Sequence, residues 1–128
     1  MSKQLHRAEA WLTSAKFGIE RRDEDSEFLT VACFDLQQSI QFALSYWLEM
    51  LNVQHDRTLS IVSLISQLVA HGEHAGILFE INNNTDLYKY WEECSRDCDD
   101  FSCALQDVVV AVELSTRLIE HIKSTFSK

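Results

Sequence analysis

The sequence predicts an all-α protein, an up-and-down bundle of four main helices with one or two short helices between the third and the last. Proline is absent and glycine occurs only three times, so the turn-rich loops of a sandwich or barrel of short strands are scarce. Hydrophobic residues recur at spacings of three and four over several long segments, which is typical of amphipathic helices. We expect residues 1–128, of which 46% are hydrophobic, to form a single domain around one core.

The first two long helices are expected at about 3–20 and about 26–52. The first has one apolar stripe, formed by Leu5, Ala8, Leu12, Ala15 and Ile19. A charged connection over 20–25 follows. In the second, apolar residues from Phe28 to Leu51 cover well over half of the circumference. A helix this apolar needs cover on several sides, so it is either the central helix of the bundle or also packs on another subunit.

In the second half of the chain, the spacing of the apolar residues predicts a third helix at about 58–70, short helices near 75–80 and 85–94, and a last long helix at about 102–126. Thr58 is the expected N-cap of the third helix. We expect Leu59, Val62, Ile65, Leu68 and Val69 to face inward from it. From the last helix we expect one inward face made by Leu105, Val108, Val109, Val112, Thr116, Ile119 and Ile122.

A polar stripe runs along the second helix. Its members, which fall within about 120° of the circumference, are Asp35, Gln38, Gln41, Ser45, Glu49 and Asn52. The stripe either lines a cleft that holds a nucleotide or a partner chain, or faces solvent. Exposed helix faces more often carry Lys and Glu, so its amide-rich character favours partial burial.

The net charge and the lack of a targeting signal limit which binding partners and which location the sequence predicts. The formal net charge of −9 repels phosphate backbones, so nucleic-acid contact needs a local basic patch. No targeting signal and no membrane-length apolar run is written in the sequence, and we expect a cytoplasmic protein without membrane contact.

The spacing of the cysteines bears on whether they are ligands of a metal ion. Cys33 lies in an apolar pattern and predicts a buried thiol. Cys94, Cys98 and Cys103, with His71 or His74, are spaced unlike a zinc knuckle. We therefore expect reduced, separately packed thiols, surface histidines, and neither a metal nor a cofactor.

Three segments in order resemble the HEPN family (higher eukaryotes and prokaryotes nucleotide-binding). They are the pattern of Ala and Trp-Leu over 8–15, the segment FDLQQSIQFAL over 34–44, and Tyr90 followed by the Arg96 segment RDCDDF. The second is similar to a family signature in which paired Gln precedes Ala, Glu and then Lys. The resemblance spans most of the chain and implies the helical bundle.

The departures from the family pattern bear on activity. Gln41 stands where the family has Glu, Ser45 where it has Lys, and Thr58-Leu59-Ser60 where many members have Thr-His-Asp. Ribonuclease members carry Arg, four to six arbitrary residues and then His at a dimer interface. No His follows Arg96 at that spacing, so the side chain that usually acts as general acid or base is missing.

Two arginines remain as candidates. Arg117 and His121 share a helix face and are able to converge on a phosphate, although the simpler interpretation is two solvated cations near a helix C-terminus. Arg96 is either an anion- or partner-binding residue or a structural ion-pair partner of Asp97, Asp99 or Asp100.

The resemblance implies an interaction module, degenerate in catalysis and homodimeric, from a toxin–antitoxin or stress-response pair with a small nucleotidyltransferase. Arg96, Tyr90, Asp35, Gln38 and Gln41 are the expected ligand- or partner-binding residues. The alternatives are a metal-independent ribonuclease that uses Arg96 or Arg117 with His121, and a nucleotide-binding domain in which Arg96 and Gln38 contact phosphate and base.

Overall fold

The computed structural model describes residues 3–25, 27–55, 60–94 and 103–126, without the side chain of Cys94. The described residues contain no strand. They contain six helices: α1 (Gln4–Glu20), α2 (Glu27–Met50), α3 (Ile61–Ala70), α4 (Gly76–Asn82), α5 (Thr85–Cys94) and α6 (Leu105–Phe126). The predicted all-α bundle, with two short helices between the third and the last, is confirmed.

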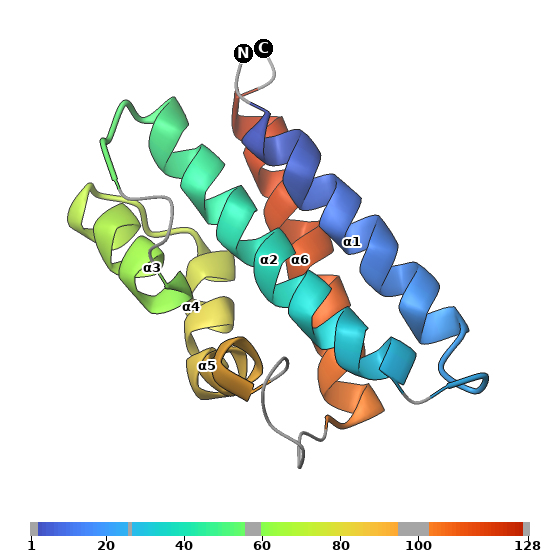
Figure 1. Ribbon diagram of the computed structural model, residues 1–128. Coiled ribbons are helices and arrows are strands. Elements are labelled where there is room, and N and C mark those ends of the chain that lie inside the picture. Colours follow the sequence, from blue (N-terminus) through green and yellow to red (C-terminus); the bar gives the residue numbers. More distant parts are fainter. Residues whose placement is uncertain (1–2, 26, 56–59, 95–102, 127–128) are drawn as a thin grey trace.

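Three long helices form one half of the molecule. Figure 1 shows α1 antiparallel to α2 and α6, while α2 and α6 run parallel to each other. The three pack against one another, and α1 and α2 make the most extensive helix contact. That contact requires Gly18, because a Cβ at this position would lie 2.9 Å from the carbonyl oxygen of Phe28 in α2. At 2.9 Å the α2 backbone leaves no room for a side chain, so glycine sets the close approach of the α1–α2 hairpin.

The central position of α2 confirms the prediction made from its apolar circumference. It contacts α1, α3, α5 and α6, and Trp47 near its C-terminal end is only 1% exposed. Leu36, Ile40 and Leu44 are fully buried along the same helix. Because four helices cover it, α2 is the element on which the rest of the fold is assembled.

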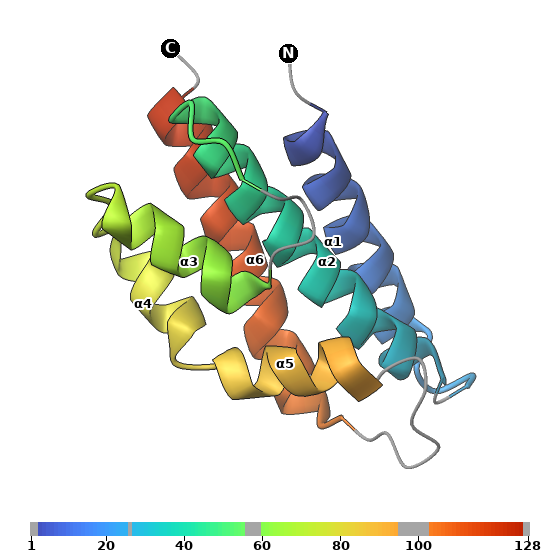
Figure 2. The same ribbon diagram turned by 60° about the vertical axis from the view of Figure 1, so that its left-hand side comes forward.

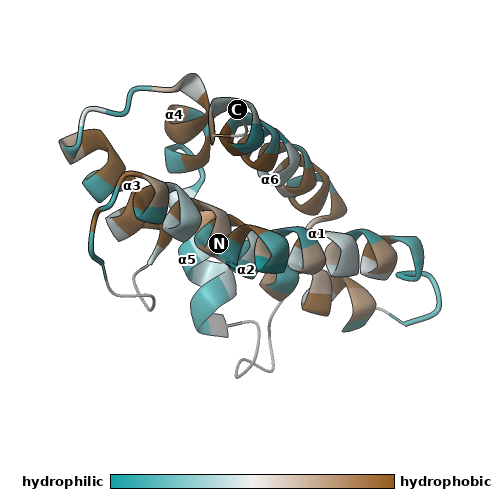
Figure 3. Ribbon diagram, turned by 90° about the horizontal axis from the view of Figure 1, so that it is seen from above, coloured by the Kyte–Doolittle hydropathy of each residue, from teal (hydrophilic) through white to brown (hydrophobic). Residues whose placement is uncertain are grey.

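Helices α3, α4 and α5 form the other half, which we call the α3–α5 unit. Figure 2 shows α3 and α4 as a hairpin beside α2 and α6, with α5 lying across the end of the bundle. Figure 3 shows hydrophobic residues along much of α3 and α4, in contrast to the hydrophilic connection between α1 and α2. The unit's buried side chains, which join the common core, are Ile61, Leu64, Ile65, Leu68, Ile77, Leu78, Ile81, Tyr88 and Trp91.

A buried polar contact ties the three long helices together. The Ser39 hydroxyl of α2 donates to the carbonyl oxygen of Ala8 in α1, at 2.7 Å. Its oxygen also lies 2.7 Å from that of Ser115 in α6. A hydroxyl has one hydrogen, so Ser115 is the donor to Ser39. Both serines are fully buried, and the contact therefore fixes the register of all three helices.

Some inward-facing predictions are wrong. Val62, Val69 and Val109 are exposed, at 43%, 38% and 51%, and Leu105 is exposed as well. In α3 and at the start of α6, neighbouring apolar residues leave the buried face undefined by periodicity alone. The buried face of α6 is instead made by Val108, Ala111, Leu114, Ser115, Leu118, Ile119 and Ile122.

The start of α3 also differs in detail. Its N-cap is Ser60, whose hydroxyl oxygen accepts a hydrogen bond from the Ser63 amide. The predicted cap, Thr58, and the predicted inward Leu59 lie outside the described residues. Across the described part of the chain, no helix has the length and apolar character to cross a membrane.

Candidate functional site

The side of α2 that its neighbours leave partly open carries residues spaced three and four apart. We call Val31, Phe34, Gln38, Gln41 and Phe42 the α2 outer strip. Val31 is 53% exposed, and the other four are half-buried. Trp11 of α1 packs edge-on against the Phe34 ring, with centroids 5.7 Å apart. The strip is therefore a mixed apolar and amide surface, braced from one side by α1.

A chain of amides holds the polar part of this strip. Gln38 donates through Nε2 to Oε1 of Gln37, at 3.2 Å. Gln37 donates in turn to Oε1 of Gln41, at 3.0 Å. Gln37 is only 1% exposed. The sequence interpretation placed Gln38 and Gln41 on the polar stripe and missed Gln37, for which the paired glutamines were the available signal. The two strip amides are thus oriented by a buried third one.

Asp35 lies beside the strip but is turned toward α1. Its side chain is buried, and Oδ2 accepts a hydrogen bond of 2.7 Å from the Ser14 hydroxyl. Burial raises the pKa of the Asp35 carboxyl above its ordinary value, and the Ser14 hydrogen bond opposes part of that rise. Of the predicted binding residues on α2, Gln38 and Gln41 come together, whereas Asp35 contributes to the α1–α2 contact.

The end of the polar stripe is covered by the segment that follows α2. Ser45 is buried, and its hydroxyl lies 2.6 Å from Nε2 of His55. His55 is held in turn by the Val53 carbonyl oxygen, 3.2 Å from Nδ1. The predicted partial burial of the stripe is therefore confirmed, and Ser45 faces protein rather than an open cleft.

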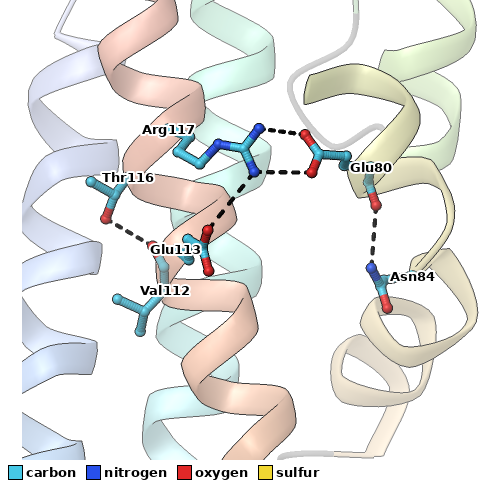
Figure 4. A network of polar contacts seen from close by, with 6 residues as sticks. All are labelled: Glu80, Asn84, Val112, Glu113, Thr116 and Arg117. Carbon is cyan, nitrogen blue, oxygen red and sulfur yellow. Dashed lines mark hydrogen bonds and ion pairs between the residues drawn. The ribbon is translucent and has the colours of Figure 1, made fainter. Parts of the chain in front are cut away.

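Arg117 and His121 of α6 have different partners. The Arg117 guanidinium reaches both carboxylate oxygens of Glu80 in α4, and one oxygen of Glu113 lies 4.0 Å from Nη1 (Figure 4). The hydrogen bond raises the pKa of Arg117 and lowers that of Glu80. The His121 ring packs on the Trp47 indole, with centroids 5.0 Å apart. Arg117 is therefore a solvent-exposed cation, as the simpler interpretation expects, although it is paired with carboxylates, whereas His121 is half-buried.

The two residues nevertheless border one pocket. Its walls come from the start of α4 and the end of α6, and its polar lining residues are Glu80, Arg117, Glu120, His121 and Ser124. Two carboxylates beside a single guanidinium disfavour an incoming phosphate. The pocket therefore brings together the residues of the ribonuclease alternative in surroundings that are acidic.

The two remaining predicted residues are Tyr90 and Arg96. Tyr90 lies on the exposed side of that helix. Arg96 lies outside the described residues, so its predicted role stays a prediction.

The cysteines show one unpredicted contact. Cys33 is a free, fully buried thiol, as expected. Cys103 is also a free thiol, and its sulfur lies 3.8 Å from the carbonyl oxygen of Leu29 in α2, one turn before Cys33. His71 and His74 are exposed. No group of three or more His, Cys, Asp or Glu residues suited to a metal occurs in the parts of the chain that the structure describes; the Cys94 side chain and Cys98 lie outside them.

Comparison with known proteins identifies the family. The model of the HEPN domain matches residues 1–123. The chain belongs to the HEPN family. No curated protein and no solved structure shows significant similarity to it. Membership supports a module related to nucleotides or RNA at the level of the family.

This HEPN domain lacks the spacing by which ribonuclease members are recognised. No arginine in the chain is followed, after four to six residues, by a histidine. The nearest approach is Arg117 with His121, separated by three residues and located in the last helix.

Proposed function

We propose that this HEPN domain is a non-catalytic interaction module. It works as a cytoplasmic homodimer and pairs with a small nucleotidyltransferase in a toxin–antitoxin or stress-response system. The observation that carries the proposal is the engagement of the one Arg–His pair near the family spacing. Arg117 is ion-paired with Glu80 and His121 packs on Trp47, so both side chains already have partners, which disfavours their use as the free acid, base or anion-binding groups of a ribonuclease site.

The apolar residues of the α2 outer strip are the surface we assign to the homodimer. Val31 is the most exposed residue of the strip, and Phe34 and Phe42 follow it on the same side of the helix. An apolar stripe along one side of a helix is the pattern by which two helices pack against each other. Val109 and Val110 of α6 are exposed as well, and we assign to them the apolar contact from the last helix.

Specificity for the nucleotidyltransferase is assigned to Arg96, Tyr90 and the strip amides Gln38 and Gln41. The amides are held in one orientation through Gln37, which favours a directional hydrogen-bonded partner over a loose apolar one. The net charge of −9 favours a partner with a basic surface and disfavours free RNA.

An RNA-cleavage assay tests the absence of catalysis. Purified full-length protein is incubated with a structured RNA beside Arg117→Ala, His121→Ala and Arg96→Ala variants. We expect no cleavage above a mock purification by any of the four proteins. Cleavage by the wild type that is lost in any one of these variants would establish a ribonuclease and overturn the proposal.

The competing function is a metal-independent ribonuclease with a rearranged site. The pocket shared by Arg117 and His121, with Ser124 beside them, is the observation that favours it. Glu80→Gln is the sharpest variant for this alternative, because it releases the Arg117 guanidinium. If the pocket is catalytic, Glu80→Gln changes cleavage without affecting the fold. Under our proposal it leaves the protein inactive.

Binding assays test the remaining parts. We expect a stable complex with a small nucleotidyltransferase from the same source as this chain, weakened by Gln38→Ala and Arg96→Ala and unchanged by the control Ser66→Ala on the exposed face of α3. A thermal-shift panel of nucleotides is expected to give no shift. A shift lost with Gln38→Ala or Arg96→Ala would favour the nucleotide-binding alternative, and the absence of any complex would contradict the assigned partner.

A further inference from the structure

The α2 helix and the start of α6 hold two thiols against each other. Cys33 is on the α2 side that faces the core and is fully buried. Cys103, two residues before α6, is partly exposed. The Cys103 sulfur lies 3.8 Å from the carbonyl oxygen of Leu29, one turn before Cys33 in α2. Residues four apart share a helix face, so Cys103 packs beside the turn of α2 that carries Cys33, against the buried cluster to which Cys33 belongs.

We propose that Cys33 and Cys103 form a thiol-oxidation site, at which a hydroperoxide converts the two thiols into a disulfide between α2 and the start of α6. This inference depends on the fold alone and stands or falls separately from the proposed function. It assigns chemistry to a residue pair that neither the predicted binding surface nor the Arg117 pocket uses.

The two thiols are suited to different roles. Cys103 is half-buried and has access to solvent, and its interaction with Cys33 lowers the pKa of its thiol, which favours the nucleophilic thiolate. The interaction with Cys103 and burial raise the pKa of Cys33, whose resting form is therefore the thiol. A hydroperoxide consequently meets Cys103 first, and Cys33 is the partner that resolves the product.

The reaction balances with the hydroperoxide as the only oxidant. The Cys103 thiol releases its proton to water, the thiolate attacks the terminal oxygen of the hydroperoxide, the O–O bond breaks, and the alkoxide leaves and takes up a proton in exchange. The Cys33 thiol then gives up its proton as its sulfur attacks the sulfur of the Cys103 sulfenic acid. The S–O bond breaks, and hydroxide leaves and combines with the Cys33 proton as water. The two thiols together lose two electrons and the hydroperoxide gains them, giving one disulfide, one alcohol and one water.

The disulfide joins parts of the molecule that are distant in sequence. It closes a loop from 33 to 103 that contains α3, α4 and α5. Closing a loop of this length restricts the unfolded chain far more than the folded one. The oxidised protein is therefore expected to melt at a temperature higher than the reduced protein by about 5 °C or more.

Peptide mapping tests the site directly. Trypsin places Cys33 alone in peptide 23–57, Cys94 in peptide 90–96, and Cys98 with Cys103 in peptide 97–117. The full chain is treated with a small excess of hydrogen peroxide, alkylated and digested. In a Cys98→Ser background we expect peptide 23–57 linked to peptide 97–117, with the link lost on reduction. A link from 23–57 to 90–96, or no link to 97–117, would overturn the proposal.

Matched variants separate this pair from the other cysteines. A variant with both Cys94→Ser and Cys98→Ser is expected to keep the disulfide and the rise in melting temperature. Cys103→Ser, which leaves the buried Cys33 in place, is expected to lose both, as is Cys33→Ala. A rise that persists in Cys103→Ser, or that vanishes in the Cys94→Ser, Cys98→Ser variant, would contradict the assignment.

Discussion

The three long helices and the α3–α5 unit are held in place by different means. Buried polar contacts tie α1, α2 and α6 together at Ser39 and at Asp35. The α3–α5 unit docks by apolar side chains, and the ion pair of Glu80 with Arg117, which ties α4 to α6, is solvent-exposed. Apolar contact is non-directional, while buried hydrogen bonds fix one geometry. The difference indicates a rigid three-helix half and a more adaptable half.

The candidate surfaces divide along the same line. The α2 outer strip belongs to the rigid half, and its amides are pre-oriented by Gln37. The pocket of Arg117 and His121 lies between α4 and α6, where the two halves meet. A preorganised surface loses less free energy on binding, which supports the strip as the binding surface. The following experiments test this comparison, from the largest expected effect to the smallest.

A cavity should lower the free energy of unfolding more in the three-helix half than in the α3–α5 unit. Leu36 in α2 and Leu78 in α4 are both fully buried. We expect Leu36→Ala to lower the free energy of unfolding by about 3–5 kcal/mol and Leu78→Ala by about 2–3 kcal/mol, because the cost depends on how far the surroundings collapse into the cavity. Urea unfolding measures both. Equal losses would remove the distinction between the two halves.

The serine contact should behave as one unit. Ser39→Ala leaves the Ser115 hydroxyl and the Ala8 carbonyl without their partner, at a cost of about 1–3 kcal/mol. Adding Ser115→Ala should cost less than the sum of the single variants, because they share one interaction. Ser66→Ala, on the exposed face of α3, serves as the control and should change little. Strict additivity in the double variant would contradict the shared contact.

Asp35 should make the rigid half sensitive to pH. Burial raises its pKa in the folded protein, so the ionised carboxylate costs stability at neutral pH, and this cost disappears as pH falls through the raised pKa. We expect Asp35→Asn, which still accepts from Ser14, to melt above the wild type at pH 7. The gap should shrink toward pH 4, where the wild-type carboxyl is increasingly protonated. A gap that widens in acid would reverse the assigned cause.

Glu80→Gln should have the smallest effect. The Glu80–Arg117 pair is exposed to solvent and screened by salt, so its contribution to global stability is small. We expect an unchanged urea midpoint, together with faster hydrogen exchange of the amides in α4. A loss of global stability as large as that of Ser39→Ala would show that the ion pair, rather than apolar packing, holds the α3–α5 unit.

The sequence predicted the helices well because each long helix has its own periodic pattern. The ends of α1, α2 and α6 lie within a few residues of those expected. The central place of α2 followed from its apolar circumference alone. Periodicity failed at Val62, Val69 and Val109, where neighbouring apolar residues allow more than one buried face.

The polar contacts were harder to predict because their partners are remote. Ser39 and Ser115 are 76 positions apart, and the local sequence around each serine gives no sign of a buried contact between them. The same holds for Glu80 with Arg117 and for Cys33 with Cys103. The candidate strip was partly predicted, through Gln38 and Gln41, since these share a helix face. Asp35 was placed with them, but its partner Ser14 lies on α1.

The oligomeric mass of the full chain tests the central claim most directly, because an interaction module of this kind requires its α2 surface to bind. Sedimentation equilibrium at micromolar concentration compares the wild type with Val31→Glu and with the control Val62→Glu, an exposed valine on α3. The account predicts twice 14.8 kDa for the wild type and the control, and 14.8 kDa for Val31→Glu. A wild type of 14.8 kDa, or a dimer that Val31→Glu leaves intact, would contradict it.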